Sequence, residues 1–131
     1  MAKFNGNEGV FVPDSLVMGQ WEARKIVLKG GQGVLKRGAV LGEITAAGSD
    51  KGKFVLSTVA ATDGSQEPDR VLAEANGAYE IDTTAGDVDA VAFIAGRFDQ
   101  DKLTLGAGHT LGSIDKPFRL RSMYLERPMG S

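Results

Sequence analysis

The sequence predicts a mainly β domain built from short strands, with one short helix near its C-terminus. Glycine supplies 18 of the 131 residues without the G-X-Y period of collagen, which indicates many turns. Several short segments alternate with a period of two residues, and only one late segment carries the signals of a helix. The chain contains no long repeat, heptad pattern or low-complexity tract that would favour another architecture.

Size and composition limit the classes of protein to which the chain can belong. A length of 131 residues fits one domain, and a content of 42% hydrophobic and 24% charged residues is typical of a globular one. The absence of cysteine excludes disulfides, thiolate zinc sites, iron–sulfur clusters and cysteine nucleophiles. With a formal net charge of −2, we expect no nucleic-acid partner. We expect no membrane association and no signal peptide, because no apolar run is long enough.

The chain divides into three unequal parts. Residues 1–12 are spaced by glycine and asparagine and lack the continuous alternation of a self-supporting strand. They form either a frayed terminus or an arm that orders only against a partner. Residues 13–128 form the single β-rich domain, and residues 129–131 are a short tail with no role in the fold.

The first strands lie in the first third of the domain. Residues 21–29 form a strand with no cleanly apolar face, which predicts an edge or partly exposed position. The glycines of residues 30–33 end it, and a second apolar run begins at residues 34–35. A turn at residues 36–38 leads into a strand over residues 39–45.

The middle of the chain repeats this pattern of strands and turns. After a loop at residues 48–52, residues 54–60 form a strand. A turn follows at residues 62–65, where Asp63 supports an Asx turn and Gly64 tolerates a positive φ. Residues 71–75 then form a short buried strand.

The last third contains the most apolar strand and the single helix. Residues 88–98 are apolar on both faces, which predicts the central strand of the core. Ser113 is the expected N-cap of the helix, Pro117 is expected within its first turn, and Leu120 is expected on its apolar side. Residues 123–125 return to a strand.

The residues that carry chemistry do not combine into a known site. His109 is the only histidine and lies in a glycine-rich loop, so it is expected to be solvated rather than a general base. Acidic pairs two residues apart place both carboxylates on one strand face, which suits a calcium ion or an acid–base pair, but none has EF-hand spacing and solvated positions are expected. These pairs are Glu80/Asp82, Asp87/Asp89 and Asp99/Asp101. We therefore expect no catalytic residue, no metal ion and no cofactor.

Two further clusters have simpler explanations than a binding site. Residues 48–53 suggest a phosphate-binding loop, but only three residues separate the glycines and Phe54 follows the lysine, so the pattern fails. Arg119, Arg121 and Arg127 surround Tyr124 and favour an edge or an interface contact over a nucleic-acid site.

Five segments, in order along the chain, resemble one known family. Residues 61–74 read ATDGSQEPDRVLAE and resemble the turn and strand of bacteriophage head decoration proteins of the lambda type. Residues 14–19 (DSLVMG) resemble the family's segment after its mobile N-terminal arm, and residues 31–42 (GQGVLKRGAVLG) resemble its entry into the core. Residues 91–108 (VAFIAGRFDQDKLTLGAG) and 118–125 (FRLRSMYL) resemble its later strands, with a serine and a methionine replacing the usual glycine and isoleucine of the last segment.

This resemblance implies a fold, a function and a location. The fold is a compact β-clip-like domain with a little helix, assembled as a homotrimer. The trimer binds the major capsid protein outside an expanded phage head, at threefold or quasi-threefold positions, and stabilises the shell against internal DNA pressure. The protein is then a structural component of the outer virion surface, present in the host cytoplasm during assembly, with no enzymatic activity and no cofactor.

The resemblance also directs attention to two sets of residues. The expected capsid-binding residues of the arm are Lys3, Phe4, Val10, Phe11 and Val12. The expected trimer contact surrounds the last helix and strand, and the alternative there is ordinary core with solvated charge. It comprises Phe118, Leu120, Arg121 and Tyr124.

Three rival functions belong to other classes of protein. A carbohydrate- or surface-binding β module would use aromatic platforms, for which the sequence offers Trp21, Tyr79 and Tyr124. A lipoyl- or biotinyl-carrier domain is suggested by Lys36 at a turn, but the neighbouring residues of such hairpins are missing. A hydrolase is least favoured, because no nucleophile, base and oxyanion donors can be assembled from these residues.

Overall fold

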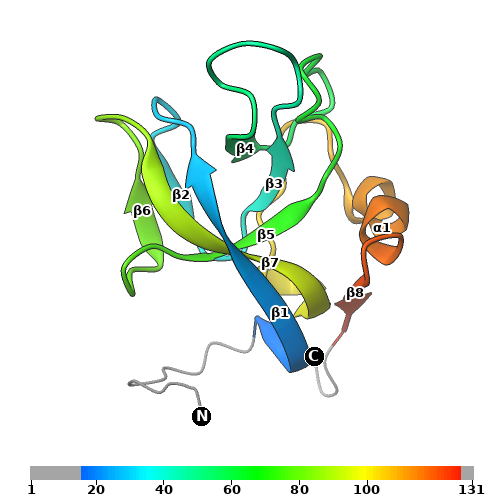
Figure 1. Cartoon of the computed structure of the whole chain (residues 1–131). Coiled ribbons are helices and arrows are strands. Elements are labelled where there is room, and N and C mark those ends of the chain that lie inside the picture. The colour runs from blue at the N-terminus through cyan, green and yellow to red at the C-terminus, as the bar shows by residue number, and fades with distance from the viewer. Residues whose placement is uncertain (1–15, 128–131) are drawn as a thin grey trace.

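The computed structural model describes residues 16–127 (Figure 1). Within them the chain forms eight strands, a 3₁₀ turn and one α-helix, so the prediction of a mainly β domain with a short C-terminal helix is confirmed. The elements are β1 (Val17–Leu28), β2 (Val34–Lys36), β3 (Val40–Glu43), β4 (Phe54–Leu56), β5 (Arg70–Glu74), β6 (Glu80–Asp82), β7 (Val88–Asp99), η1 (Gln100–Lys102), α1 (Leu111–Arg119) and β8 (Met123–Glu126).

Six of the strands form one mixed sheet in the order β1-β4-β3-β5-β7-β8. A further pairing between β1 and β7 closes five of these strands into a small barrel, and β8 continues the sheet beyond β7. β2 and β6 form a separate two-stranded ribbon beside the barrel (Figure 1). β7 pairs with three strands of this sheet, β1, β5 and β8. The predicted central position of residues 88–98 is therefore confirmed.

Alternate residues of the central strands enter two different hydrophobic cores. On β5, Leu72 belongs to the first core and Val71 to the second; on β7, Ala92 belongs to the first and Phe93 to the second. Successive side chains of a strand point to opposite faces, so these strands are apolar on both faces because both faces are buried.

The two cores have distinct members. The buried residues of the first core are Ile26, Leu28, Leu35, Ala39, Leu41, Phe54, Leu72, Ala75, Ile81, Ala90 and Ala92. Those of the second core are Leu16, Val40, Val71, Ala73, Phe93, Phe98, Ile114, Phe118 and Met123. The second core therefore joins the barrel to α1 and β8.

Helix α1 covers the second core through two side chains four residues apart. Ile114 and Phe118 are fully buried, as the 3.6-residue period of a helix requires for one apolar face. The helix begins one turn earlier than predicted, because Thr110 is the N-cap and Ser113 is the third helical residue of a capping box. The prediction that Ser113 is the N-cap is therefore wrong.

Two other predictions for the helix are also wrong. Pro117 lies inside the helix near its end rather than in its first turn. Leu120 forms the C-cap and is 73% exposed, because it lies two residues beyond Phe118 and so projects away from the buried face. The C-terminal end of α1 therefore presents a large apolar side chain to solvent.

Several strand boundaries differ from those predicted. β1 begins at Val17 and pairs with β7 over most of its length, whereas β4 meets it only at Leu28. Within residues 16–127, much of β1 therefore has a free edge, in agreement with its mixed pattern. β4 ends at Leu56, before the predicted residue 60, and β6 was not predicted at all. In β6 only Ile81 is buried, so this strand leaves little hydrophobic signal.

Close backbone approaches fix the loops beside the barrel. A Cβ atom on Gly42 would lie 2.0 Å from the carbonyl oxygen of Ser65, and one on Gly106 would lie 1.9 Å from that of Ser57. Only glycine fits either position. The turn at residues 62–65 forms as predicted, with Asp63 accepting hydrogen bonds from the Ser65 amide and hydroxyl.

Gln32 holds three parts of the chain together through its side chain and its backbone amide. Its Nε2 donates to the carbonyl oxygens of Lys29 and Phe54, and its Oε1 accepts from the Leu56 amide. The backbone amide of Gln32 donates to the buried hydroxyl of Thr83. A surface loop is thereby fixed against β4 and against the residues that follow β6.

The first testable prediction concerns Ser122, which links α1 to β8 with a φ of 62°. A left-handed backbone costs a non-glycine residue about 1 kcal/mol, and the extra entropy of glycine in the unfolded chain offsets part of that. Ser122→Gly is expected to raise the free energy of unfolding by up to about 0.5 kcal/mol. Urea denaturation measures this change. Ser49→Gly is the control. Because Ser49 has no positive φ, this substitution should lower the free energy of unfolding of the protein.

The second testable prediction concerns Lys53, whose ammonium lies 2.7 Å from Asp87 and 3.1 Å from Asp50. The hydrogen bond to Asp87 raises the pKa of Lys53, and the same bond lowers the pKa of Asp87 from its usual 3.8. This stabilisation is therefore present between the two pKa values. It is lost as the pH falls through the folded pKa of Asp87 or rises through that of Lys53.

Lys53→Met should accordingly be less stable than the wild type near pH 7, and the difference should shrink in acid below pH 3.8. Urea denaturation across this pH range provides the measurement. Lys51→Met is the matched control, because Lys51 makes no ion pair within residues 16–127. A difference between Lys53→Met and the wild type that stays constant down to pH 2 would contradict the proposed pairing.

Candidate assembly surfaces

The single histidine occupies a hydrogen-bonded position between two loops and α1. His109 Nε2 lies 3.1 Å from the Ser57 hydroxyl and 3.1 Å from the carbonyl oxygen of Gln66. Its Nδ1 lies 2.9 Å from the Ser113 hydroxyl. The expectation of a solvated histidine is therefore wrong: the residue is half-buried and both ring nitrogens have partners. It was missed because Ser57 and Gln66 are distant in sequence.

This Ser–His contact lacks the geometry of a nucleophile and its base. Ser57 is fully buried, and its hydroxyl donates to the carbonyl oxygen of Ser65 at 2.7 Å. The Ser57 oxygen therefore cannot meet a substrate. His109 instead fastens the loop of residues 57–66 to the start of α1.

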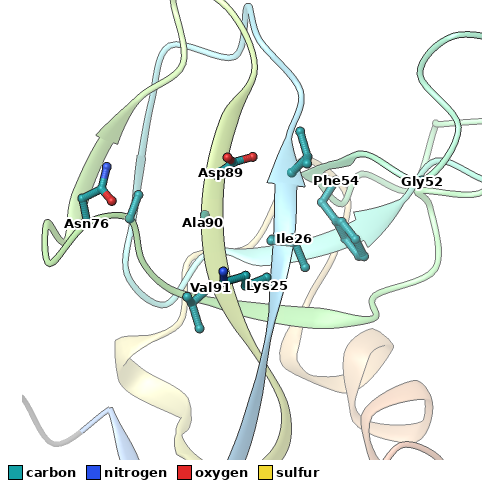
Figure 2. A pocket seen from close by; sticks show the side chains of 10 residues that line it. Lys25, Ile26, Gly52, Phe54, Asn76, Asp89, Ala90 and Val91 are labelled. Atoms are coloured by element: carbon teal, nitrogen blue, oxygen red, sulfur yellow. The ribbon is translucent and has the colours of Figure 1, made fainter. Parts of the chain in front are cut away.

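One surface depression, with a volume of 540 Å³, crosses β1 and β7. Figure 2 shows that Lys25 and Asp89 supply its charged side chains, beside apolar Ile26, Phe54 and Val91. Within residues 16–127 no cluster of three or more His, Asp or Glu side chains is placed to hold a metal ion. The charged groups of this depression form no set of converging reactive groups.

The acidic pairs lie mostly at the surface. Glu80 and Asp82 project from the exposed face of β6, as their spacing predicts. Asp87 and Asp89 are exposed at the start of β7. Asp99 is buried, and it accepts a hydrogen bond from the Asp101 amide at the start of η1.

Large exposed apolar side chains occur at five described positions. These are Trp21, Val34, Val59, Leu120 and Tyr124. Leu120 and Tyr124 flank the turn between α1 and β8 and form what we call the α1–β8 corner. Trp21 lies on β1, near the end at which the described chain begins.

The four residues expected at a trimer contact occupy different environments. Phe118 is fully buried in the second core, while Leu120 and Tyr124 are 73% and 43% exposed. Arg121 is half-buried and makes contacts within its own chain. Only Leu120 and Tyr124 therefore present large apolar surface at the α1–β8 corner.

Arg121 belongs to an ion-pair network that the sequence did not reveal. Its Nε lies 3.1 Å from Asp69, and its Nη1 lies 3.4 Å from Glu67 and donates to the carbonyl oxygen of Pro117 at 2.9 Å. Asp69 also pairs with Arg70. Since some fifty residues separate Arg121 from Asp69, no local pattern indicates this pairing.

The expected arm residues lie outside the described part of the chain. Lys3, Phe4, Val10, Phe11 and Val12 all precede Leu16, so the structure does not test their role. Within residues 16–127, no helix has the length and apolar character needed to cross a membrane.

The described residues form a small, mainly β domain with large apolar side chains exposed at five positions. Comparison with protein families matches residues 12–118 to bacteriophage lambda head decoration protein D. The chain belongs to this family of phage head decoration proteins, and the suspected resemblance is confirmed. No curated protein matches the sequence.

Family membership gives the general function. The chain is a structural protein that decorates bacteriophage heads and associates with the exterior of the capsid.

The third testable prediction compares the loss of stability on substitution of two arginines near the α1–β8 corner. Arg121→Ala should lower the free energy of unfolding by about 1–3 kcal/mol, because the half-buried Asp69 loses a charged partner. Arg119→Ala should cost no more than about 0.5 kcal/mol, since its pairing with Asp115 is an exposed i,i+4 contact. Thermal or urea unfolding compares the two. Equal losses would show that the Arg121 network adds no stability beyond a surface ion pair.

Proposed function

We propose that this protein binds the outside of the expanded phage head as a homotrimer at threefold or quasi-threefold positions. There it stabilises the shell against the pressure of the packaged DNA. Its partner is the major capsid protein, and before assembly it resides in the host cytoplasm. The observation that carries this proposal is the family match over residues 12–118.

A threefold assembly suits a small domain with surface patches. Rotational symmetry closes a heterologous contact after three copies, so one patch and its complement are enough. The α1–β8 corner supplies a candidate patch, in which Leu120 and Tyr124 are exposed. Phe118 and Arg121 hold this corner in place through the core and through Asp69.

Attachment to the shell is proposed to involve the arm, residues 1–12. Its apolar residues Phe4, Val10, Phe11 and Val12, with Lys3, can add an extended segment to a sheet edge of the capsid protein. Ordering one such segment costs about 1–2 kcal/mol per residue, so a single arm binds weakly. Three arms on one trimer raise the effective concentration and multiply avidity by about 10²–10⁴.

The proposal includes no catalytic activity. His109 contacts two serine hydroxyls, those of Ser57 and Ser113. The Ser57 hydroxyl is inaccessible, and the Ser113 hydroxyl is hydrogen-bonded to the Thr110 backbone in the capping box of α1. The rival carbohydrate-binding function has a specific difficulty. Trp21 lies over Gly96, whereas Tyr124 is paired with Arg97, so the two exposed aromatics lie on opposite faces of β7 and β8.

The fourth testable prediction is that deletion of residues 1–12 lowers affinity for undecorated expanded heads by at least about 10²-fold and leaves the trimer intact. Sedimentation with heads measures binding, and multi-angle light scattering measures the mass of the free protein. Deletion of residues 129–131 is the matched control and should change neither.

The outcomes separate the parts of this proposal. Undiminished binding of the shortened protein would exclude the arm as the attachment site. A full-length protein that binds no expanded head would overturn the proposed function. A mass of one chain at all concentrations, together with binding to heads, would restrict trimer formation to the capsid surface.

A further inference from the structure

Trp21 is the only tryptophan of the chain, and it is 54% exposed to solvent. The indole makes an edge-to-face contact with Phe93 at a centroid distance of 5.5 Å. Within residues 16–127 the indole N–H donates to no acceptor. A large aromatic side chain with a free donor is the type of residue that dominates protein interfaces.

The backbone of β1 is irregular at this position. Between Met18 and Glu22 the strand advances four residues while β7 advances only two, from Arg97 to Ala95. Residues 19–21 therefore form a bulge, which we call the β1 bulge. Gly19 in the bulge has a φ of 68°, which glycine adopts at no steric cost. Bulges of this kind redirect side chains and occur next to functional sites.

The bulge sets the indole over a position with no side chain. A Cβ atom on Gly96 would lie 3.2 Å from the Trp21 Cβ. Beside it lies an open depression of 520 Å³ lined by Gln20, Trp21, Glu22 and Ala95. The exposed indole thus borders a surface that can receive a protruding group of a partner.

Connectivity indicates which partner this surface meets. If Val12 contacts the shell, the four-residue separation places Leu16 at most about 14 Å away. Leu16 is fixed to the barrel, because its carbonyl oxygen accepts a hydrogen bond from the Asp99 amide at 2.8 Å. In that case the start of β1 lies close to the shell. Figure 1 shows this end of β1 near β8 and far from the β2–β6 ribbon.

We propose that the β1 bulge is a second capsid contact, in which Trp21 inserts into an apolar recess of the major capsid protein. This inference rests on the proposed function and adds to it a rigid contact beside the arm. The recess should contain an acceptor for the indole N–H. The arm then captures the shell, and the bulge fixes the orientation of the domain upon it.

The simplest alternative is that Trp21 only covers the rim of the second core through its contact with Phe93. That role predicts a loss of stability on substitution and no separate loss of capsid binding. Trp21→Phe distinguishes the two possibilities, because it keeps a ring against Phe93 but removes the N–H donor and part of the exposed surface.

The test measures binding of folded, full-length variants to undecorated expanded heads. Trp21→Ala is expected to weaken binding at least about tenfold, and Trp21→Phe to weaken it by a smaller factor. Val34→Ala is the matched control, since Val34 is 53% exposed but lies on β2. It should bind as the wild type does. Urea denaturation and light scattering show that each variant is folded and has the wild-type mass.

A second measurement is independent of mutational damage. The protein carrying 5-hydroxytryptophan at position 21 can be excited selectively in the presence of the tryptophans of the capsid. Quenching of its emission by acrylamide should decrease on binding to heads, because the indole becomes buried.

Each outcome decides the matter. Wild-type binding by folded Trp21→Ala, or unchanged quenching on the heads, would overturn the second contact and leave the proposed function standing. Loss of the trimer in Trp21→Ala would assign the bulge to the contact between copies instead. Glycan binding that Trp21→Ala abolishes would assign it to a carbohydrate, and failure of the wild type to bind any head would overturn both proposals.

Discussion

The fold depends on the burial of β7 on both of its faces. Ala92 is buried in the first core, and Phe93 is buried in the second core between the barrel and α1. A shift of one residue would exchange these two side chains between the cores. The register of β7 therefore fixes the registers of β1, β5 and β8, which all pair with it.

The segments that identify the family are explained by packing. Gly42 and Gly106 are the two sites where carbonyl oxygens of the loop around Ser57 and Ser65 approach too closely for any Cβ atom. Asp63 closes the turn between those carbonyls and has its pKa lowered by hydrogen bonds from Ser65. The segments that resemble the family thus contain the positions at which this loop packs closely against the barrel.

Local periodicity was enough to predict the mainly β class and the central strand, because β7 carries its signal in consecutive residues. It failed where the deciding contact is distant in sequence. The half-buried position of His109 depends on Ser57 and Gln66, and the role of Arg121 depends on Asp69. The helix start was misplaced because Thr110 and Ser113 are both good caps, and only the backbone shows which hydroxyl accepts the N3 amide.

The path from Leu16 into the barrel suggests why such a small domain suits the proposed reinforcement of a shell. A pull on the arm would enter the domain at Leu16 and pass along β1, which pairs with β7 from Val17 to Leu28. Force directed along paired strands is shared among many hydrogen bonds, whereas force across an edge opens them singly. Because β7 is packed in both cores, the tension is distributed to α1 and the rest of the barrel. A contact at the β1 bulge would share the same strand, so arm and bulge would act on one rigid element.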